Sequence, residues 1–277
     1  RASESIFPDT INVRTVTVTA FNHSRELPLT SFEIDSAVAA RRINKDLGNV
    51  LQFSSPVILK RMGSDGLASV SLRGMSGSHT SVLWNGMEIN APMTGQMDFA
   101  LIPMFAADKI KISPGGADLS GISGSIGGKI YISSNDYIPE GISLKVFTGA
   151  GSYDKYTGGV SFAAGRGHFG SSTKLWFRNA LNDFRFVNED APGGPETLRR
   201  TNAASHMKGL LQDFTFSNRR NKVSAHLWLN DVYRLLPSAV TTVQNNLGEN
   251  QKDRSVRAAI NYTLSGSKIK SEINAGY

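Results

Sequence analysis

Two patterns of apolar and polar positions divide this chain. Beyond about residue 141 the two kinds of residue alternate one by one, as Leu227 and Leu229 do with Trp228 and Asn230. Before that point, short β-branched runs alternate with Gly-rich turns around one segment of helical spacing. Strict alternation indicates strands with one apolar face. The chain is therefore predicted to hold a mixed α/β unit over residues 1–136 and long antiparallel strands over residues 137–277.

The first unit is predicted to contain one helix among short strands. Apolar residues at helical spacing over residues 37–53 predict the helix, with Asp35 or Ser36 as its N-cap and Pro56 beyond its end. A short helical turn is expected within residues 97–105. The expected strands, rich in β-branched residues, are 13–20, 30–36, 57–61, 68–73, 81–84, 87–90, 109–113 and 129–133.

The second unit is predicted to contain about seven strands of a membrane β-barrel. Its connections alternate between short turns (165–170, 217–221, 266–267) and long polar loops (184–204, 235–253). Long loops at one end and short turns at the other are typical of outer-membrane barrels. A soluble β-sandwich also alternates, but it does not account for this ordering of loops. Large plugged barrels have about 22 strands, so we interpret the chain as part of a longer protein.

Composition excludes several other classes. The 277 residues include no cysteine, which excludes disulfides and thiolate metal sites. The net charge of +7 comes from scattered lysines and arginines, without the basic stripe typical of nucleic-acid binding. No apolar run reaches the roughly 18–20 residues of a spanning helix. The start, RASESIFPDT, lacks the pattern of a signal peptide, which we expect to have been removed or to lie upstream.

No catalytic, cofactor or metal site is predicted. The glycine-rich residues 121–128 lack the G-x-x-x-x-G-K-[ST] pattern and lead into a strand, so turn glycines are the better interpretation. There is no G-x-S-x-G elbow, and the five histidines form neither H-x-H nor H-x-x-x-H. An enzyme is therefore the least favoured class.

Three motifs carry a resemblance to a known family. Residues 71–74 (SLRG) resemble its "IRG" strand end, residues 82–89 (VLWNGMEI) its "VLIDGV" hairpin, and residues 124–132 (GSIGGKIYI) its "GAIGGVINI". Their order and spacing also fit. The chain thus resembles the TonB-dependent outer-membrane receptors over nearly its whole length, most of all the cobalamin-receptor type. It departs at residues 114–122, where the usual arginine and tyrosine of "RGP…LYG" are absent.

The resemblance implies an α+β plug domain followed by antiparallel transmembrane β-barrel strands, here a truncated barrel. It also implies a TonB box near the N-terminus, and an exposed β-prone segment suits recruitment of a partner by strand addition. Residues 15–20 (TVTVTA) are a second candidate, and both segments could be ordinary plug strands. The favoured TonB-contact residues are Asp9, Thr10, Ile11, Asn12 and Val13.

Two plug loops are the candidates for substrate contact. Residues 62–67 and 89–98 combine neutral hydrogen-bonding groups with flexible thioethers, which suit a bulky neutral or chelated ligand. The alternative is that these loops only pack inside the barrel. The candidate substrate-binding residues are Ser64, Asp65, Asn90, Met93, Thr94, Gln96 and Met97. By resemblance, the plug framework is assigned to Arg73, Gly74, Gly86, Gly127 and Gly128.

Acidic residues in and beside the 184–204 loop raise the question of calcium, which accepts oxygen ligands at varied spacing. No strict spacing is present, so a solvated loop is favoured for Asp183, Glu189, Asp190 and Glu196.

Together these observations predict an outer-membrane transporter that takes up a scarce nutrient, cobalamin or a ferric siderophore, through contact with TonB. Its expected partners are TonB, the nutrient and outer-membrane lipid, with no nucleic acid and no cofactor. Glycan import is a further alternative, as is a soluble carbohydrate-binding β-protein.

Overall fold

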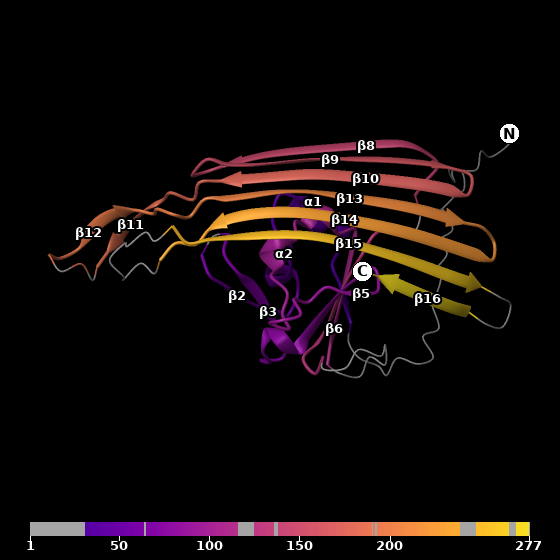
Figure 1. The fold of residues 1–277 in the computed structure, drawn as a ribbon, viewed down its shortest axis with the longest axis horizontal. Coiled ribbons are helices and arrows are strands. Elements are labelled where there is room, and N and C mark those ends of the chain that lie inside the picture. The colour runs from indigo at the N-terminus through magenta and orange to yellow at the C-terminus, as the bar shows by residue number, and fades with distance from the viewer. Residues whose placement is uncertain are drawn as a thin grey trace, which may run out of the picture.

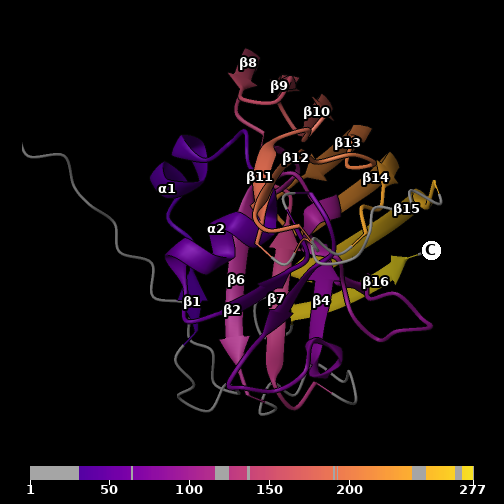
Figure 2. The same cartoon turned by 90° about the vertical axis from the view of Figure 1, so that its left-hand side faces the viewer.

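The computed structural model describes residues 31–63, 65–115, 125–135, 138–189, 191, 193–238, 248–265 and 270–276. It consists of a small mixed unit, called the plug below, and a long curved sheet, called the wall (Figure 1). Figure 2 shows the wall strands end-on as an arc with the plug inside its curve. Trp84 of the plug meets Trp228 of the wall there, with ring centroids 5.4 Å apart.

The wall is antiparallel throughout. In the described part of the chain it contains seven strands in the order β16-β15-β14-β13-β10-β9-β8, the predicted number. Their bounds are β8 Gly141–Gly151, β9 Lys155–Arg166, β10 Phe169–Ala180, β13 Ser205–Ser217, β14 Asn221–Leu235, β15 Asn250–Ser265 and β16 Lys270–Gly276. Consecutive strands pair with each other except where a small hairpin intervenes between β10 and β13. The predicted fold class is confirmed.

The alternation along each wall strand separates an apolar outer face from a polar inner face. On β10, Leu175 and Phe177 are 48% and 53% exposed, whereas Trp176 and Arg178 between and beside them are 5% and 7% exposed. The inner residues face the plug, and Arg178 donates to the backbone oxygen of Ala100 there. A soluble sheet buries its apolar face, whereas a membrane barrel turns that face towards hydrocarbon. The apolar outer face therefore fits a membrane wall.

The plug is built on a five-stranded sheet of order β1-β6-β7-β4-β5, in which β4 and β7 run parallel. Beside it lies the antiparallel pair β2–β3. The bounds are β1 Phe32–Glu33, β2 Ile58–Arg61, β3 Ala68–Ser71, β4 Thr80–Trp84, β5 Met87–Glu88, β6 Lys109–Pro114 and β7 Gly128–Ser133. Apart from β1, which is shorter than residues 30–36, each begins and ends within two residues of its prediction. The 13–20 segment lies outside the described residues.

The single helix predicted over residues 37–53 is wrong. The structure has α1 at Ser36–Arg41 and α2 at Leu47–Ser54. Asp35 caps α1, and Asp46 interrupts the helix because its carboxylate accepts from the Asn49 amide over 2.9 Å as the cap of α2. A second reason is tertiary: the amide of Leu47 donates to the Ile102 oxygen over 2.8 Å. No helix in the described part of the chain is long and apolar enough to cross a membrane.

The 3₁₀ turns η1 Gly77–His79, η2 Phe99–Leu101 and η3 Met104–Ala106 complete the plug, the last two within or overlapping the predicted helical turn. Its core is apolar and fully buried, with Leu47, Leu51, Ile102, Ile110, Ile112, Ile130 and Ile132 at its centre.

Both predicted long loops need correction. Residues 184–204 contain the hairpin of β11, Arg185–Asn188, and β12, Glu196–Arg199, which extends from one end of the wall (Figure 1, left). The 235–253 loop is shorter than predicted because the ladder pairs Leu235 with Asn250 and Val232 with Asp253. The ends of β14 and β15 are polar there, so the sequence pattern of these residues resembled that of a loop. The turns at 165–170 and 217–221 are short, as predicted.

The domain boundary predicted at residues 136/137 lies outside the described residues. The last plug strand ends at Ser133 and the first wall strand begins at Gly141. The boundary stays a prediction.

Candidate functional site

The interface between plug and wall is charged, with carboxylates on the plug and cations on the wall. Asp108 meets Lys174 at 2.6 Å and Asp98 meets Arg234 at 2.6 Å. Longer ion pairs join Arg178 to two further plug carboxylates, those of Asp46 and Asp65. Each cation occupies an inward position of an alternating strand. The wall therefore holds the plug by charge complementarity as well as by packing.

Asp98 connects three parts of the molecule. Its Oδ1 accepts from the amides of Ala68 (2.9 Å) and Ala100 (3.0 Å), which fixes two plug segments. Its Oδ2 accepts from Arg234 of β14, whose guanidinium also donates to Gln251 of β15 over 2.9 Å. Both charged side chains are buried. Because a buried charge is costly without its partner, this pair couples the position of the plug segment to the wall.

Asp65 is the buried residue of the predicted substrate loop 62–67. Asn182 donates to its Oδ2 over 2.8 Å, and Lys155 and Arg178 lie 3.5 Å and 3.8 Å from its Oδ1. Burial opposes ionisation of this carboxyl, but the charges of Arg178 and Lys155, with the bonds from Asn182 and Lys155, outweigh it and hold the pKa of Asp65 below its ordinary value. Asp65 is thus an ionised link between the plug loop and the wall.

A cavity of about 700 Å³, called the apex cavity, is lined in part by Asp65. It lies at the end of the wall that carries the 184–204 and 235–253 connections, called the long-loop end below. It combines apolar side chains, neutral amides and hydroxyls, and the cations Arg200 and Arg234. Such a lining suits a bulky ligand with both apolar and hydrogen-bonding surface. The lining residues are Met62, Gly63, Asp65, Gly66, Leu67, Asn182, Phe184, Arg200, Ala203, Ser205, Arg234, Leu235, Leu236, Pro237, Ser238 and Gln251.

The second predicted substrate loop, residues 89–98, does not line the apex cavity. Asn90 holds this loop in shape: its side chain donates to the Thr80 and Gly95 oxygens and accepts from the Val82 amide. Met97 is buried in the plug core, and Met93 at the tip is 99% exposed. The remaining two predicted residues lie between them, Thr94 exposed and Gln96 half-buried.

The predicted framework residues lie at tight turns. Gly86 (φ 87°) follows Asn85 (φ 46°) at the β4–β5 turn, where the wall's Asn261 donates to the Asn85 oxygen over 2.9 Å. A side chain on Gly128 would meet the Ser113 oxygen at 2.6 Å, and the Gly127 amide donates to the His79 oxygen. Arg73 and Gly74 both have positive φ at the end of β3. These residues shape the plug backbone and stay assigned to its framework.

The structure describes only some of the residues predicted for substrate, TonB and calcium contact. Ser64 and the TonB-contact segment, residues 9–13, lie outside the described residues, as does Asp190. Among the calcium candidates, Asp183 pairs with Arg199 at 2.5 Å. The described residues contain no group of three acidic or histidine side chains placed to hold a metal ion.

Comparison with known proteins shows which family of domains the plug resembles. The TonB-dependent Receptor Plug Domain matches residues 24–129, which covers all the described plug except the end of β7. Residues 24–129 are therefore assigned to the plug domain of the TonB-dependent receptors. The wall curves around one side of this domain as an open sheet, which fits an incomplete barrel.

Two relatives of this chain are named as transporters. The chain is 29% identical over 185 residues to the vitamin B12 transporter BtuB of Vibrio vulnificus (strain YJ016), which covers 65% of this chain and 30% of that protein. The BtuB of Photobacterium profundum is 30% identical over 142 residues, 51% of this chain and 22% of that protein. The chain therefore spans less than a third of the length of these relatives.

The fold is shared with the P. aeruginosa receptor FpvA in complex with a ferric pyoverdine. The TM-score is 0.71 at 12% identity, over 91% of this chain and 34% of FpvA. At that identity the likeness concerns the fold alone.

Sequence reasoning missed the wall's contribution to the site. Asn182, Arg200 and Arg234 come from wall strands and their connections, and none was singled out. One signal was available: Arg178 and Arg234 sit at inward positions of alternating strands, where a charge needs a partner. The plug carboxylates are those partners.

Proposed function

We propose that this chain is part of an outer-membrane transporter that takes up a bulky nutrient of the cobalamin type. In this proposal TonB supplies the energy for uptake through contact with residues 9–13. The similarity to two vitamin B12 transporters supports the substrate class. The apolar outer face of the wall supports a location in the outer membrane, since it would be exposed in a soluble protein. The proposed reaction is transport, with no bond made or broken in the nutrient.

One observation carries the proposal: the apex cavity is built from the residues that fasten the plug. Arg234 lines the cavity and also binds Asp98, and Asp65 lines it and also meets Arg178. A nutrient that touches these side chains changes the contacts that hold the plug against the wall. Such differential contact is what allows a ligand to shift a conformational equilibrium.

TonB would act through the segment that precedes the plug. The β-prone sequence of residues 9–13 suits strand addition to TonB through main-chain hydrogen bonds, and in this proposal force on that segment reaches the plug. The buried ion pairs resist that force until the nutrient has altered them. In this scheme residues 65, 98 and 234 couple occupation of the cavity to release of the plug.

Uptake by the full-length protein tests the proposal. A strain lacking the receptor is complemented with the wild type or with a variant lacking residues 5–13, and uptake of labelled cobalamin and ferric siderophores is measured. We expect cobalamin uptake with the wild type, and surface binding without uptake with the deletion. Uptake that persists in the deletion would refute the TonB assignment, and absence of cobalamin binding would refute the substrate class.

Ferric siderophores are the second candidate, favoured by Arg200 and Arg234 in the apex cavity. Many iron chelates carry negative charge, which two guanidinium groups would attract. In the same uptake assay, substitution of Arg200 by Gln separates the two substrates. A neutral corrinoid should lose little affinity, whereas an anionic chelate should lose about tenfold, since a charged hydrogen bond is worth about 1.5–3 kcal/mol.

A further inference from the structure

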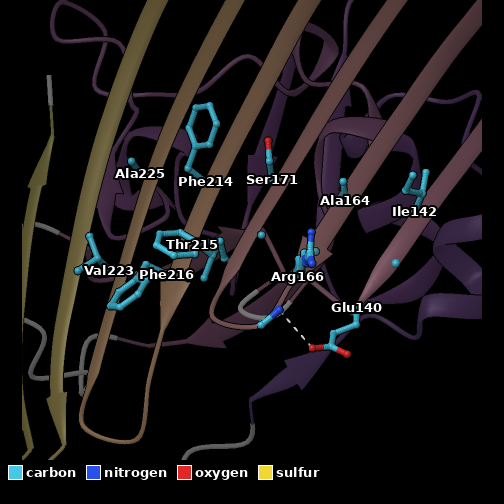
Figure 3. Close-up of a pocket in the computed structure, with 15 residues that line it drawn as sticks. Glu140, Ile142, Ala164, Arg166, Ser171, Phe214, Thr215, Phe216, Val223 and Ala225 are labelled. Carbon is cyan, nitrogen blue, oxygen red and sulfur yellow. Dashed lines mark hydrogen bonds between the residues drawn. The ribbon is translucent and has the colours of Figure 1, made fainter.

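A groove of about 1040 Å³ lies on the outer face of the wall near its short-turn end (Figure 3). It is called the outer groove below. It faces away from the plug, because most of the side chains that line it occupy outward positions of β8, β9, β10, β13 and β14. It is therefore separate from the apex cavity, and nothing in nutrient transport requires it.

The register of the strands explains the shape of the groove. One row across the sheet runs Ile142, Ala164, Ser171 and Phe214, since each pairs with the next on the adjacent strand. The small side chains of Ala164 and Ser171 form the floor between the two bulky ones. Nearer the short turns, Phe169 lies between Arg166 and Phe216 in a second row. The result is an apolar groove with Arg166 at the end nearer the short turns.

Arg166 is the notable group of this groove. Its side chain is exposed, and among the described residues it has no carboxylate partner. Glu140 also lines the groove, but its carboxylate accepts from the Gly167 amide over 3.2 Å (Figure 3). Two more exposed arginines, Arg219 and Arg220, follow in the neighbouring turn. The short-turn end thus has excess positive charge beside apolar surface.

A second outer groove, of about 620 Å³, lies further along the wall towards the long-loop end and provides a contrast. Its cations Lys208 and Arg254 both meet Asp231, at 3.8 Å and 3.4 Å. Both cations there already have a carboxylate neighbour, although one carboxylate offsets only one of the two positive charges. Of the two grooves, the one at the short-turn end is therefore the one whose cation is left for a ligand.

We propose that the outer groove binds one anionic glycerophospholipid, with an acyl chain over Ala164 and Ser171 and its phosphate at Arg166. Aromatic residues such as Phe169 and Phe216 commonly mark the level where hydrocarbon meets headgroups in membrane barrels. At that level a phosphate and a guanidinium are both stable, and basic side chains near a membrane surface attract anionic lipids. The acyl chain lies along the apolar floor of the groove. This inference rests on the proposed membrane location.

Native mass spectrometry of the full-length, detergent-solubilised receptor tests the lipid site. Phosphatidylglycerol and phosphatidylcholine are titrated separately against the wild type and three variants. The wild type should retain one phosphatidylglycerol, and Arg166→Gln should bind it about fivefold more weakly. Ala164→Phe, which fills the floor, should also lose it although Arg166 remains. The control Arg254→Gln, at the other groove, should match the wild type.

The proposal is overturned if Arg166→Gln retains phosphatidylglycerol as the wild type does, or if phosphatidylcholine is held equally well. Loss of the lipid in the Arg254→Gln control would also overturn it, because it would indicate non-specific surface charge. A dimer in the wild type that Ala164→Phe abolishes would overturn it too, by assigning the groove to a second copy of the chain.

Nutrient binding is measured on the same samples with labelled cobalamin. Retention of the lipid without cobalamin binding would support the lipid site and refute the proposed substrate. Cobalamin binding with no lipid selectivity would do the reverse.

Discussion

Arg234 of the wall donates a hydrogen bond to Asp98 of the plug over 2.6 Å, with both side chains almost fully buried. The same arginine lines the apex cavity, and the same carboxylate holds the amides of Ala68 and Ala100. One ion pair thus joins the apex cavity, the plug interior and the wall. A change at either residue is therefore expected to reach all three.

Replacing Arg234 with Met should weaken the attachment of the plug by about 3–5 kcal/mol, because Asp98 would remain as an uncompensated buried charge. Hydrogen exchange at the amides of Ala68 and Ala100 should accelerate. The double variant Arg234→Met/Asp98→Asn removes that charge and should recover part of the protection. The control Arg254→Gln changes an exposed arginine and should stay within about 0.5 kcal/mol. Unchanged exchange in Arg234→Met would contradict the coupling.

Acid should release the loop that carries Asp65. The pKa of this carboxyl is lowered in the folded protein, so its ion pairs contribute stability above the ordinary value of 3.8, and that contribution is lost as the pH falls through the lower folded pKa. Hydrogen exchange of residues 62–67, corrected for the intrinsic rate, should therefore rise only in strong acid. In Asp65→Asn the loop should exchange faster at neutral pH and show no such step. A step near neutrality would indicate a different group.

A charge on the outer face of the wall should destabilise the receptor in a bilayer. Leu175 lies midway along β10 and is 48% exposed, so Leu175→Arg should cost about 2–4 kcal/mol. Unfolding by urea in lipid vesicles measures this cost. Leu175→Ala is the matched control, which removes apolar surface without adding charge. Equal stability of the Arg and Ala variants would contradict a lipid-facing position.

Two framework glycines should differ in their tolerance of alanine. Both Gly74 (φ 73°) and Gly128 (φ 143°) have backbone conformations that side chains rarely adopt, but of these two only Gly128 is also crowded, by the Ser113 oxygen and Leu72. Strain of this kind costs about 1–3 kcal/mol per residue. Gly128→Ala should therefore lower plug stability more than Gly74→Ala, as measured by protease resistance of the plug. The reverse order would show that steric crowding does not determine which substitution lowers plug stability more.

Sequence reasoning succeeded where the pattern is local. The alternation of Leu227 and Leu229 with Trp228 and Asn230 predicted a wall strand, and β14 has that face pattern. It failed where a distant contact decides, as at Asp46, whose cap and the bond from Leu47 to Ile102 divide the predicted helix. At Asn90, predicted as a substrate contact, the side chain bonds within the plug and holds its own loop in shape.

The sequence by itself determined the two-part fold, the seven wall strands in the described residues and the resemblance of the plug to a known family, because period-two alternation and turn glycines act over a few residues. Only the tertiary structure decided which charges face each other. The pairs Asp98–Arg234 and Asp65–Arg178 join residues more than a hundred positions apart, and no local pattern encodes such partners. The same holds for Arg166, whose lack of a carboxylate partner among the described residues became meaningful only when its neighbours in space were known. Burial makes a charge depend on its surroundings, and those surroundings exist only in the folded chain.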